Sequence, residues 1–171
     1  MSKRAYMAAL DVDGRRCVVV GDGGLAAEKA DGLAACGAVV ERIASKRYKR
    51  RLLNGAFLVI ASTSDRALDE RIYRDAERRN MLCNVADVPD LCNFILPAVH
   101  REGPIAVAVS TGGASPALAK RLRDEIAALV GPEHAELAGE LEAMRPEVKR
   151  RFLSYEERRD YFDSLVAERL G

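Results

Sequence analysis

The fold is decided by the stretch at residues 15–26, which reads Arg-Arg-Cys-Val-Val-Val-Gly-Asp-Gly-Gly-Leu-Ala. Its apolar, β-branched run ends at Gly21 and is typical of a short buried strand. The following residues 27–35 are rich in Ala, Leu, Glu and Lys, which favour a helix, and Gly37 suits the position just past a helix end. The stretch therefore predicts a strand, a glycine loop and a helix in direct succession.

The loop itself has the spacing Gly21-x-Gly23-x-x-Ala26, the dinucleotide-binding pattern in its Ala-ending form. Gly21 allows a tight turn, Gly23 lets the backbone approach a pyrophosphate, and the small Ala26 permits close packing of helix on strand. Free amides and the positive end of the helix are suited to holding phosphates. A nucleotide site is the favoured interpretation, and a purely structural turn is the alternative.

The residues after the second predicted strand bear on the choice of nucleotide. Glu41 stands at about the spacing of an acid that binds ribose hydroxyls, whereas Arg42, Lys46 and Arg47 suit a 2′-phosphate. NAD is the cofactor we predict, with NADP as the alternative.

A second strand is predicted at 38–43, further apolar runs follow at 57–61, 81–85 and 105–109, and a helical segment at 64–79 has Asp65 near its start. Strands covered on both faces are apolar throughout, so five such runs alternating with helices predict an α/β fold with a doubly wound parallel sheet. After them, Ser115-Pro116 begins a helix to about Val130, and residues 133–170 are helical, charged and interrupted at Pro146.

Composition narrows the function classes. The 171 residues fit one domain with a small appendage, and 49% hydrophobic residues exclude a disordered chain. The net charge of +1 argues against a polyanion binder held by charge alone. Four cysteines without a C-x-x-C pair, and only two histidines, predict no metal site. With no secretory signal and no apolar run of about 20 residues, we expect a cytoplasmic protein that does not enter a membrane.

Three stretches together resemble the short siroheme synthases, which are precorrin-2 dehydrogenases and sirohydrochlorin ferrochelatases. The stretches are Val18–Ala30, Cys83–Pro89 leading to Phe94–Pro97, and Val107–Ala119, with a weaker match at Val148-Lys149 and Arg158-Arg159. The resemblance implies a Rossmann-type NAD-binding domain at 1–109, a dimerisation segment at 110–131 and a small all-helical domain at 132–171, working as a homodimer.

The resemblance also implies a reaction. In that family the substrate is precorrin-2, a reduced tetrapyrrole with eight carboxylates, and NAD accepts a hydride to give sirohydrochlorin in siroheme synthesis. Some members also insert ferrous iron, as a substrate, to give siroheme. Because this chain carries no methyltransferase domain, we expect uroporphyrinogen methylation to be done elsewhere.

The family's functional residues fall on specific positions here. Its catalytic aspartate falls on Asp87, and the serine of its Ser-Thr-Gly-Gly-x-Ser-Pro motif falls on Ser115. Cofactor contacts fall on Gly21, Gly23, Gly24, Leu25, Ala26, Ser45, Lys46 and Thr63. Many relatives have three consecutive glycines where Asp22 interrupts the loop, and an acid where Lys46 now stands.

The chemistry accounts for Asp87 independently. Hydride loss from a porphyrinoid leaves a proton to remove, and the carboxyl end of a parallel strand is where such sheets place their ligands. The alternative is an Asx-turn residue before Pro89. Gly112-Gly113 offers amides to a substrate carboxylate or makes only a turn.

Basic clusters leave other interpretations open. Residues 46–51 include Tyr48, a combination that single-strand binders use, although a solvated helix start is favoured and no nucleic-acid partner is predicted. The candidates to meet substrate carboxylates are Lys120, Arg121, Arg123, Lys149, Arg150 and Arg151, which otherwise form charged helix faces. A nucleotide-sensing regulatory module without catalysis is the alternative function, since it needs the glycine loop but not Asp87.

Overall fold

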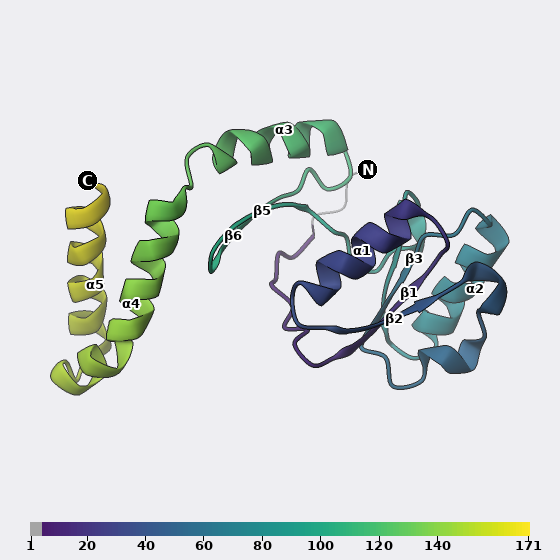
Figure 1. Ribbon diagram of the computed structural model, residues 1–171, viewed down its shortest axis with the longest axis horizontal. Helices are drawn as coiled ribbons and strands as arrows, with labels where there is room; N and C mark the ends of the chain where they lie inside the picture. Colours follow the sequence, from purple (N-terminus) through teal and green to yellow (C-terminus); the bar gives the residue numbers. More distant parts are fainter. Residues whose placement is uncertain (1–4) are drawn as a thin grey trace. The chain divides into compact units, whose positions relative to one another are not determined.

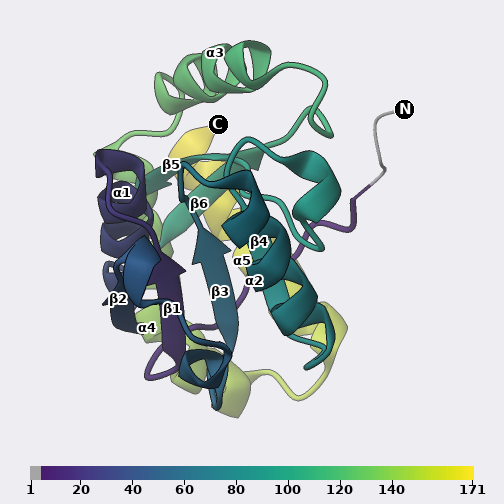
Figure 2. The same cartoon turned by 90° about the vertical axis from the view of Figure 1, so that its right-hand side faces the viewer.

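The structure is a computed structural model that describes residues 5–171, and these divide into compact units at Ala5–Leu96 and Pro97–Gly171 (Figure 1). The first unit contains a parallel sheet built from β1 (Arg16–Val20), β2 (Val39–Ile43), β3 (Leu58–Ala61) and β4 (Leu82–Val85). The strand order is β2-β1-β3-β4 (Figure 2). This confirms the predicted Rossmann-type sheet.

Helices α1 (Gly24–Ala34) and α2 (Arg66–Glu77) cover opposite faces of this sheet (Figure 1). Side chains alternate between faces along a strand, so β1 and β3 supply apolar residues to both helices. The core on the α1 side includes Cys17, Val19, Ala26, Ala30, Leu58 and Ile60. The core on the α2 side includes Val18, Val20, Val59, Ala61, Ile72 and Ala76. Burial on both faces explains why β3, and β1 from Cys17 onward, are apolar throughout.

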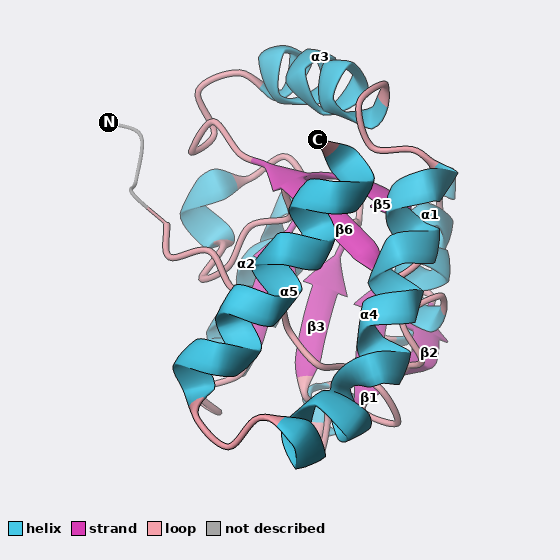
Figure 3. Cartoon of the chain, turned by 90° about the vertical axis from the view of Figure 1, so that its left-hand side faces the viewer, coloured by secondary structure: helices cyan, strands magenta, loops and turns pink. Residues whose placement is uncertain are grey.

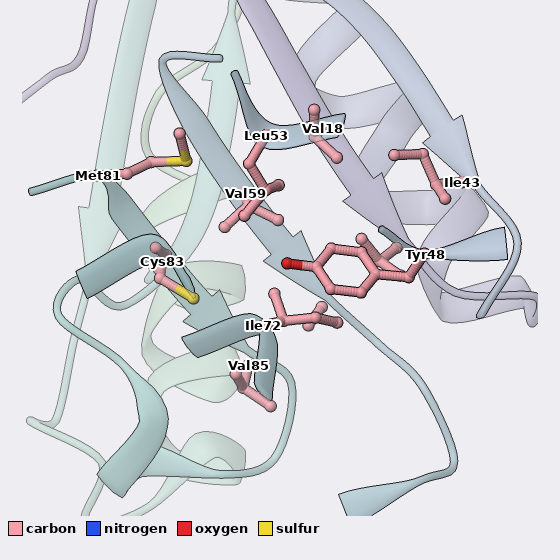
Figure 4. Packing of buried hydrophobic residues seen from close by; sticks show 12 residues of the cluster. Val18, Ile43, Tyr48, Leu53, Val59, Ile72, Met81, Cys83 and Val85 are labelled. Carbon is pink, nitrogen blue, oxygen red and sulfur yellow. The ribbon is translucent and has the colours of Figure 1, made fainter. Parts of the chain in front are cut away.

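The basic stretch after β2 is anchored by Tyr48, whose ring lies in the α2-side core (Figure 4). It forms short 3-10 turns at Ser45–Arg47 and Arg50–Leu53 rather than a helix. The Tyr48 hydroxyl donates to Asp75 Oδ2 at 3.1 Å, and burial is the main cause that raises the pKa of Tyr48. Because the ring is 6% exposed, it is not available to stack on a nucleotide base.

Replacing Tyr48 with Phe is expected to lower the free energy of unfolding by about 1 to 3 kcal/mol. The buried Asp75 carboxylate would lose its hydroxyl donor and keep the Arg78 guanidinium at 3.9 Å. Urea titration followed by circular dichroism measures this, with Tyr6→Phe as the control because Tyr6 is 95% exposed. Equal midpoints for the two variants would show that the buried hydrogen bond contributes nothing.

The second unit corrects the placement of residues 105–109, which were expected to join the parallel sheet. They form β6 (Ile105–Val109), which pairs antiparallel with β5 (Ala98–Glu102) in a separate ribbon (Figure 3). Gly103, at φ +54, permits the tight Gly-Pro turn between them. Half-buried and exposed residues alternate along β6. This pattern is typical of a ribbon that is covered on one face, and not of a strand buried on both faces.

The remaining helices of this unit are α3 (Pro116–Ala127), α4 (Pro132–Arg151) and α5 (Tyr155–Leu170). The expected interruption at Pro146 is wrong, because α4 runs through this residue. The chain instead breaks before Ser154, whose side chain and that of Glu157 form a capping box that starts α5. The Phe152 and Tyr161 ring centroids are 5.2 Å apart, and Arg169 pairs with Glu140, so α4 and α5 form an antiparallel hairpin (Figure 3). Over residues 5–171, no helix combines the length and the apolar character needed to cross a membrane.

Candidate functional site

The glycine loop leaves the carboxyl end of β1, next to β3. Gly21 has φ +154, and a Cβ there would lie 2.3 Å from the carbonyl oxygen of Ser62. Only glycine fits so close to the neighbouring backbone. Since the chain after β1 turns to β2 on one side and later returns as β3 on the other, the loop lies at the switch point where α/β sheets bind ligands.

The next glycines leave the start of α1 open. Gly23 is the extended N-cap residue without a side-chain cap, and a Cβ at Gly23 or Gly24 would meet no atom within 4 Å. The first amides of a helix have no partner within the helix and carry partial positive charge. Leu25 is 38% exposed beside them, whereas Ala26 is buried against the sheet. This arrangement fits a pyrophosphate.

At the carboxyl end of β2, a carboxylate from the loop meets the main chain. Asp22 Oδ2 accepts a hydrogen bond from the Ser45 amide at 3.1 Å. Hydrogen bonds from the Ser45 hydroxyl and amide, followed by the nearby Lys46 and Arg42 charges, hold the pKa of Asp22 below its usual value. Asp22 therefore stays ionised at neutral pH.

Glu41, which the sequence offered as the ribose-binding acid, does not reach this end of the sheet. It pairs with Val18 in the middle of the β1–β2 ladder. The Arg16 guanidinium donates to Glu41 Oε2 at 3.1 Å and 2.5 Å. The spacing along the chain was suitable, but the residue lies two positions before the end of its strand and is committed to an ion pair.

Beyond β3, Thr63 faces the first turn of α2. Its hydroxyl donates to Asp69 Oδ1 at 2.7 Å and accepts from the Asp65 amide at 3.2 Å. Burial is the main cause that raises the pKa of Asp69, while the Thr63 hydrogen bonds act in the opposite direction. The Thr63 side chain is thus committed to α2, which leaves its backbone groups for a cofactor. Sequence reasoning missed Asp69, because no local pattern marks it.

Asp87 lies where the chain turns after β4. The turn is tied by the Ala86 amide to Ala61 O at 2.8 Å and by the Val88 amide to Val85 O at 3.2 Å. Asp87 has φ +60, in the left-handed region that costs most residues about 1 kcal/mol or more. Its side chain is exposed, and among the described residues its carboxylate accepts no hydrogen bond, so it forms no Asx turn. The carboxylate is free to act on a ligand.

Ser115 belongs to the second unit, where it caps α3. Its Oγ accepts from the Leu118 amide at 3.2 Å, and Thr111 Oγ1 bonds to both its amide and its carbonyl group at 3.0 Å. Gly112 and Gly113, at φ +62 and +86, make the preceding turn. The structure therefore gathers the loop glycines, Leu25, Ser45, Lys46, Thr63 and Asp87 at one edge of the parallel sheet, whereas Ser115 lies in the other unit.

Replacing Ser115 with Ala is expected to lower the free energy of unfolding by about 0.5 to 2 kcal/mol, the usual cost of an N-cap. The loss should be largely restored in Ser115→Asp, which also caps helices well. Circular dichroism during urea titration measures both variants. Equal losses in the two would contradict a capping role.

Histidines do not form a metal centre in this structure. His100 Nε2 lies 3.2 Å from Val130 O, and His134 Nδ1 accepts from the Gly131 amide at 3.2 Å. Throughout residues 5–171, no three His, Cys, Asp or Glu side chains gather in a way that could hold a metal ion.

Comparison with known proteins agrees with this geometry. Residues 8–98 match the family model described as putative NAD(P)-binding, and residues 102–129 match the one described as sirohaem biosynthesis protein central. Siroheme synthase of Methylobacillus flagellatus is 35% identical over 91% of this chain and 38% of its own length. Siroheme synthase of Nitrosococcus oceani is 33% identical over 94% of this chain and 39% of its own length.

A solved structure, SirC, precorrin-2 dehydrogenase, has the same fold with a TM-score of 0.77 at 22% identity, covering 98% of this chain and 93% of that one. The chain spans about two fifths of the length of the curated relatives above, at 38% and 39%. The chain therefore belongs to the putative NAD(P)-binding family and is a homologue of the siroheme synthases.

Proposed function

We propose that the chain oxidises precorrin-2 to sirohydrochlorin, with NAD as the hydride acceptor. The observation that carries the proposal is the exposed Asp87 carboxylate at the same sheet edge as the open glycine loop. The names of the relatives and of the solved structure support the substrate class. In this reaction the substrate loses one hydride and one proton, and NADH and a proton are the other products.

The residues at the loop fit the cofactor. Gly23, Gly24 and the start of α1 would hold the pyrophosphate, while Gly21 keeps the loop close to β3. Bound NAD+ supplies an acceptor for the hydride. Asp87 accepts the proton that the substrate releases, because its carboxylate is exposed and has no internal partner in the described chain.

Cations of the second unit are suited to the substrate carboxylates. Arg121 and Arg123 are engaged with Glu125 and Asp124, at 2.6 Å each. Within the described residues, Lys120, Lys149 and Arg150 are exposed and have no ion-pair partner. The latter three are therefore the cations of the second unit that remain available to an anionic ligand.

An anaerobic assay tests the function. Precorrin-2 and NAD+ are incubated with the chain, and NADH formation and the tetrapyrrole spectrum are followed together. We expect one NADH to form for each precorrin-2 that is oxidised. Ferrous iron is then added to test whether siroheme also forms. NAD+ binding without turnover would contradict the proposal and would instead support a nucleotide-sensing module. A cytoplasmic setting is part of the proposal, in keeping with the four free cysteines.

We also propose a homodimer in which residues 110–131 supply the contact. In the second unit, apolar side chains on α3 and after it are exposed, with fractions of 50% at Leu118, 37% at Leu122 and 73% at Leu129. Burying such residues is what a second copy would do. At micromolar concentration, sedimentation should show about twice the 18.7 kDa chain mass. Leu118→Glu should weaken the dimer at least about tenfold, and a monomeric wild type would disprove it.

A further inference from the structure

The carboxyl end of β2 lacks the acid that NAD-binding folds usually place there. In such folds an Asp or Glu after the second strand binds the adenosine ribose hydroxyls. Here β2 ends at Ile43, and Ala44, Ser45 and Lys46 follow. Glu41 lies within the strand and is paired with Arg16. No residue of β2 or of the turn after it therefore offers a free carboxylate.

A carboxylate nevertheless reaches this position, and it comes from the glycine loop. Asp22 lies between Gly21 and Gly23, and its Oδ2 accepts the Ser45 amide at 3.1 Å. Its side chain is exposed, and Ser45 is the hydrogen-bond donor that the described part of the chain gives it. Ser45 thus fixes the group at the end of β2, and the exposed carboxylate keeps lone pairs for a ligand beside the start of α1.

We propose that Asp22 binds the adenosine ribose and makes the site selective for NAD over NADP. The proposal rests on the proposed function, because it assumes that the loop binds a dinucleotide. A carboxylate accepts hydrogen bonds from ribose hydroxyls but repels a 2′-phosphate, which carries up to two negative charges.

Two nearby cations could instead bind a 2′-phosphate at that position. Arg42 and Lys46 are both exposed and lie close enough to act on the charge of Asp22. Each has a long side chain that loses conformational freedom when it binds, and exposed ion pairs contribute little. Asp22 is short and held by a backbone amide, so its position is the better defined. The arrangement therefore favours the ribose hydroxyls over a phosphate.

The test measures the dissociation constants of NAD+ and NADP+ by calorimetry on the full chain. Wild type should bind NAD+ at least about tenfold more tightly than NADP+. Asp22→Asn keeps an oxygen for the Ser45 amide but removes the charge, so NADP+ should bind at least about tenfold more tightly than to wild type. Asp22→Gly, which places three consecutive glycines in the loop, should lose the preference in the same way.

Control variants separate the outcomes. Asp31→Asn removes an exposed charge from α1, away from the loop, and should leave the ratio of the two constants unchanged. Lys46→Ala should not reduce the NAD+ preference. A wild type that favours NADP+, or an unchanged ratio in both Asp22 variants, would overturn the inference alone. A chain that binds neither nucleotide would instead overturn the proposed function.

Discussion

Replacing Asp87 with Asn is expected to lower the kcat of precorrin-2 oxidation by about 10²-fold or more while leaving the dissociation constant of NAD+ unchanged. Asn has nearly the same size and tolerates the left-handed backbone at φ +60, so the turn after β4 should be kept. It cannot accept a proton at the working pH, however. The expected effect is therefore on chemistry rather than on binding or folding.

Anaerobic assays with saturating NAD+ measure kcat, and calorimetry measures the dissociation constant of NAD+. Asp90→Asn is a matched control, because the exposed Asp90 lies three residues further along in a 3-10 turn (Pro89–Leu91). It should retain wild-type turnover. Full activity in Asp87→Asn would remove Asp87 from the proposed mechanism, and a common loss in both variants would indicate a disturbed turn.

The loop glycines provide the second large effect, since substitutions at Gly21 and Gly23, two positions apart, should impair the protein for different reasons. Gly21→Ala forces a Cβ to within 2.3 Å of Ser62 O at φ +154, and we expect a loss of about 2 to 5 kcal/mol in unfolding free energy. Gly23→Val meets open space at φ −90, so the fold should persist. Its branched side chain would cover the amides, and NAD+ binding should weaken by about 10²-fold or more.

Urea titration and calorimetry distinguish the two. The expected pattern is an unstable Gly21→Ala and a stable Gly23→Val that no longer binds the dinucleotide. If Gly23→Val binds NAD+ with wild-type affinity, the pyrophosphate does not lie on this loop. If Gly21→Ala unfolds at the wild-type midpoint, the close approach of β1 and β3 is not required.

The parallel sheet could be predicted because its central strands are buried on both faces and are therefore apolar from Cys17 to Val20 and from Leu58 to Ala61. The same rule failed at Ile105–Val109, since an apolar run of five residues does not reveal whether its second face is covered. The Gly103-Pro104 turn was the available signal for a hairpin. The interruption predicted at Pro146 was wrong for a different reason, because a long helix can tolerate one proline. The local signal for the true break was the capping box of Ser154 and Glu157.

At the site, residues marked by local spacing were predictable and those defined by pairing across the fold were not. The glycine pattern and the position of Asp87 after an apolar run are local features. The bonds of Asp22 to Ser45, Arg16 to Glu41 and Thr63 to Asp69 join residues 23, 25 and 6 positions apart. They depend on strand register and helix rotation. A carboxylate at the right distance along the chain can therefore lie two residues away from the place it was expected to fill.

The backbone at Asp87 has a consequence for how this protein can change by mutation. Among residues with a carboxylate, Asp is far better suited than Glu to φ +60, so Glu is expected to be a poor substitute although it keeps the charge. Gly and Asn suit the conformation at least as well as Asp, and neither accepts a proton. On the proposed mechanism, a single substitution that preserves the turn would abolish turnover and leave the fold intact, so that catalysis could be lost in one step without a penalty in folding.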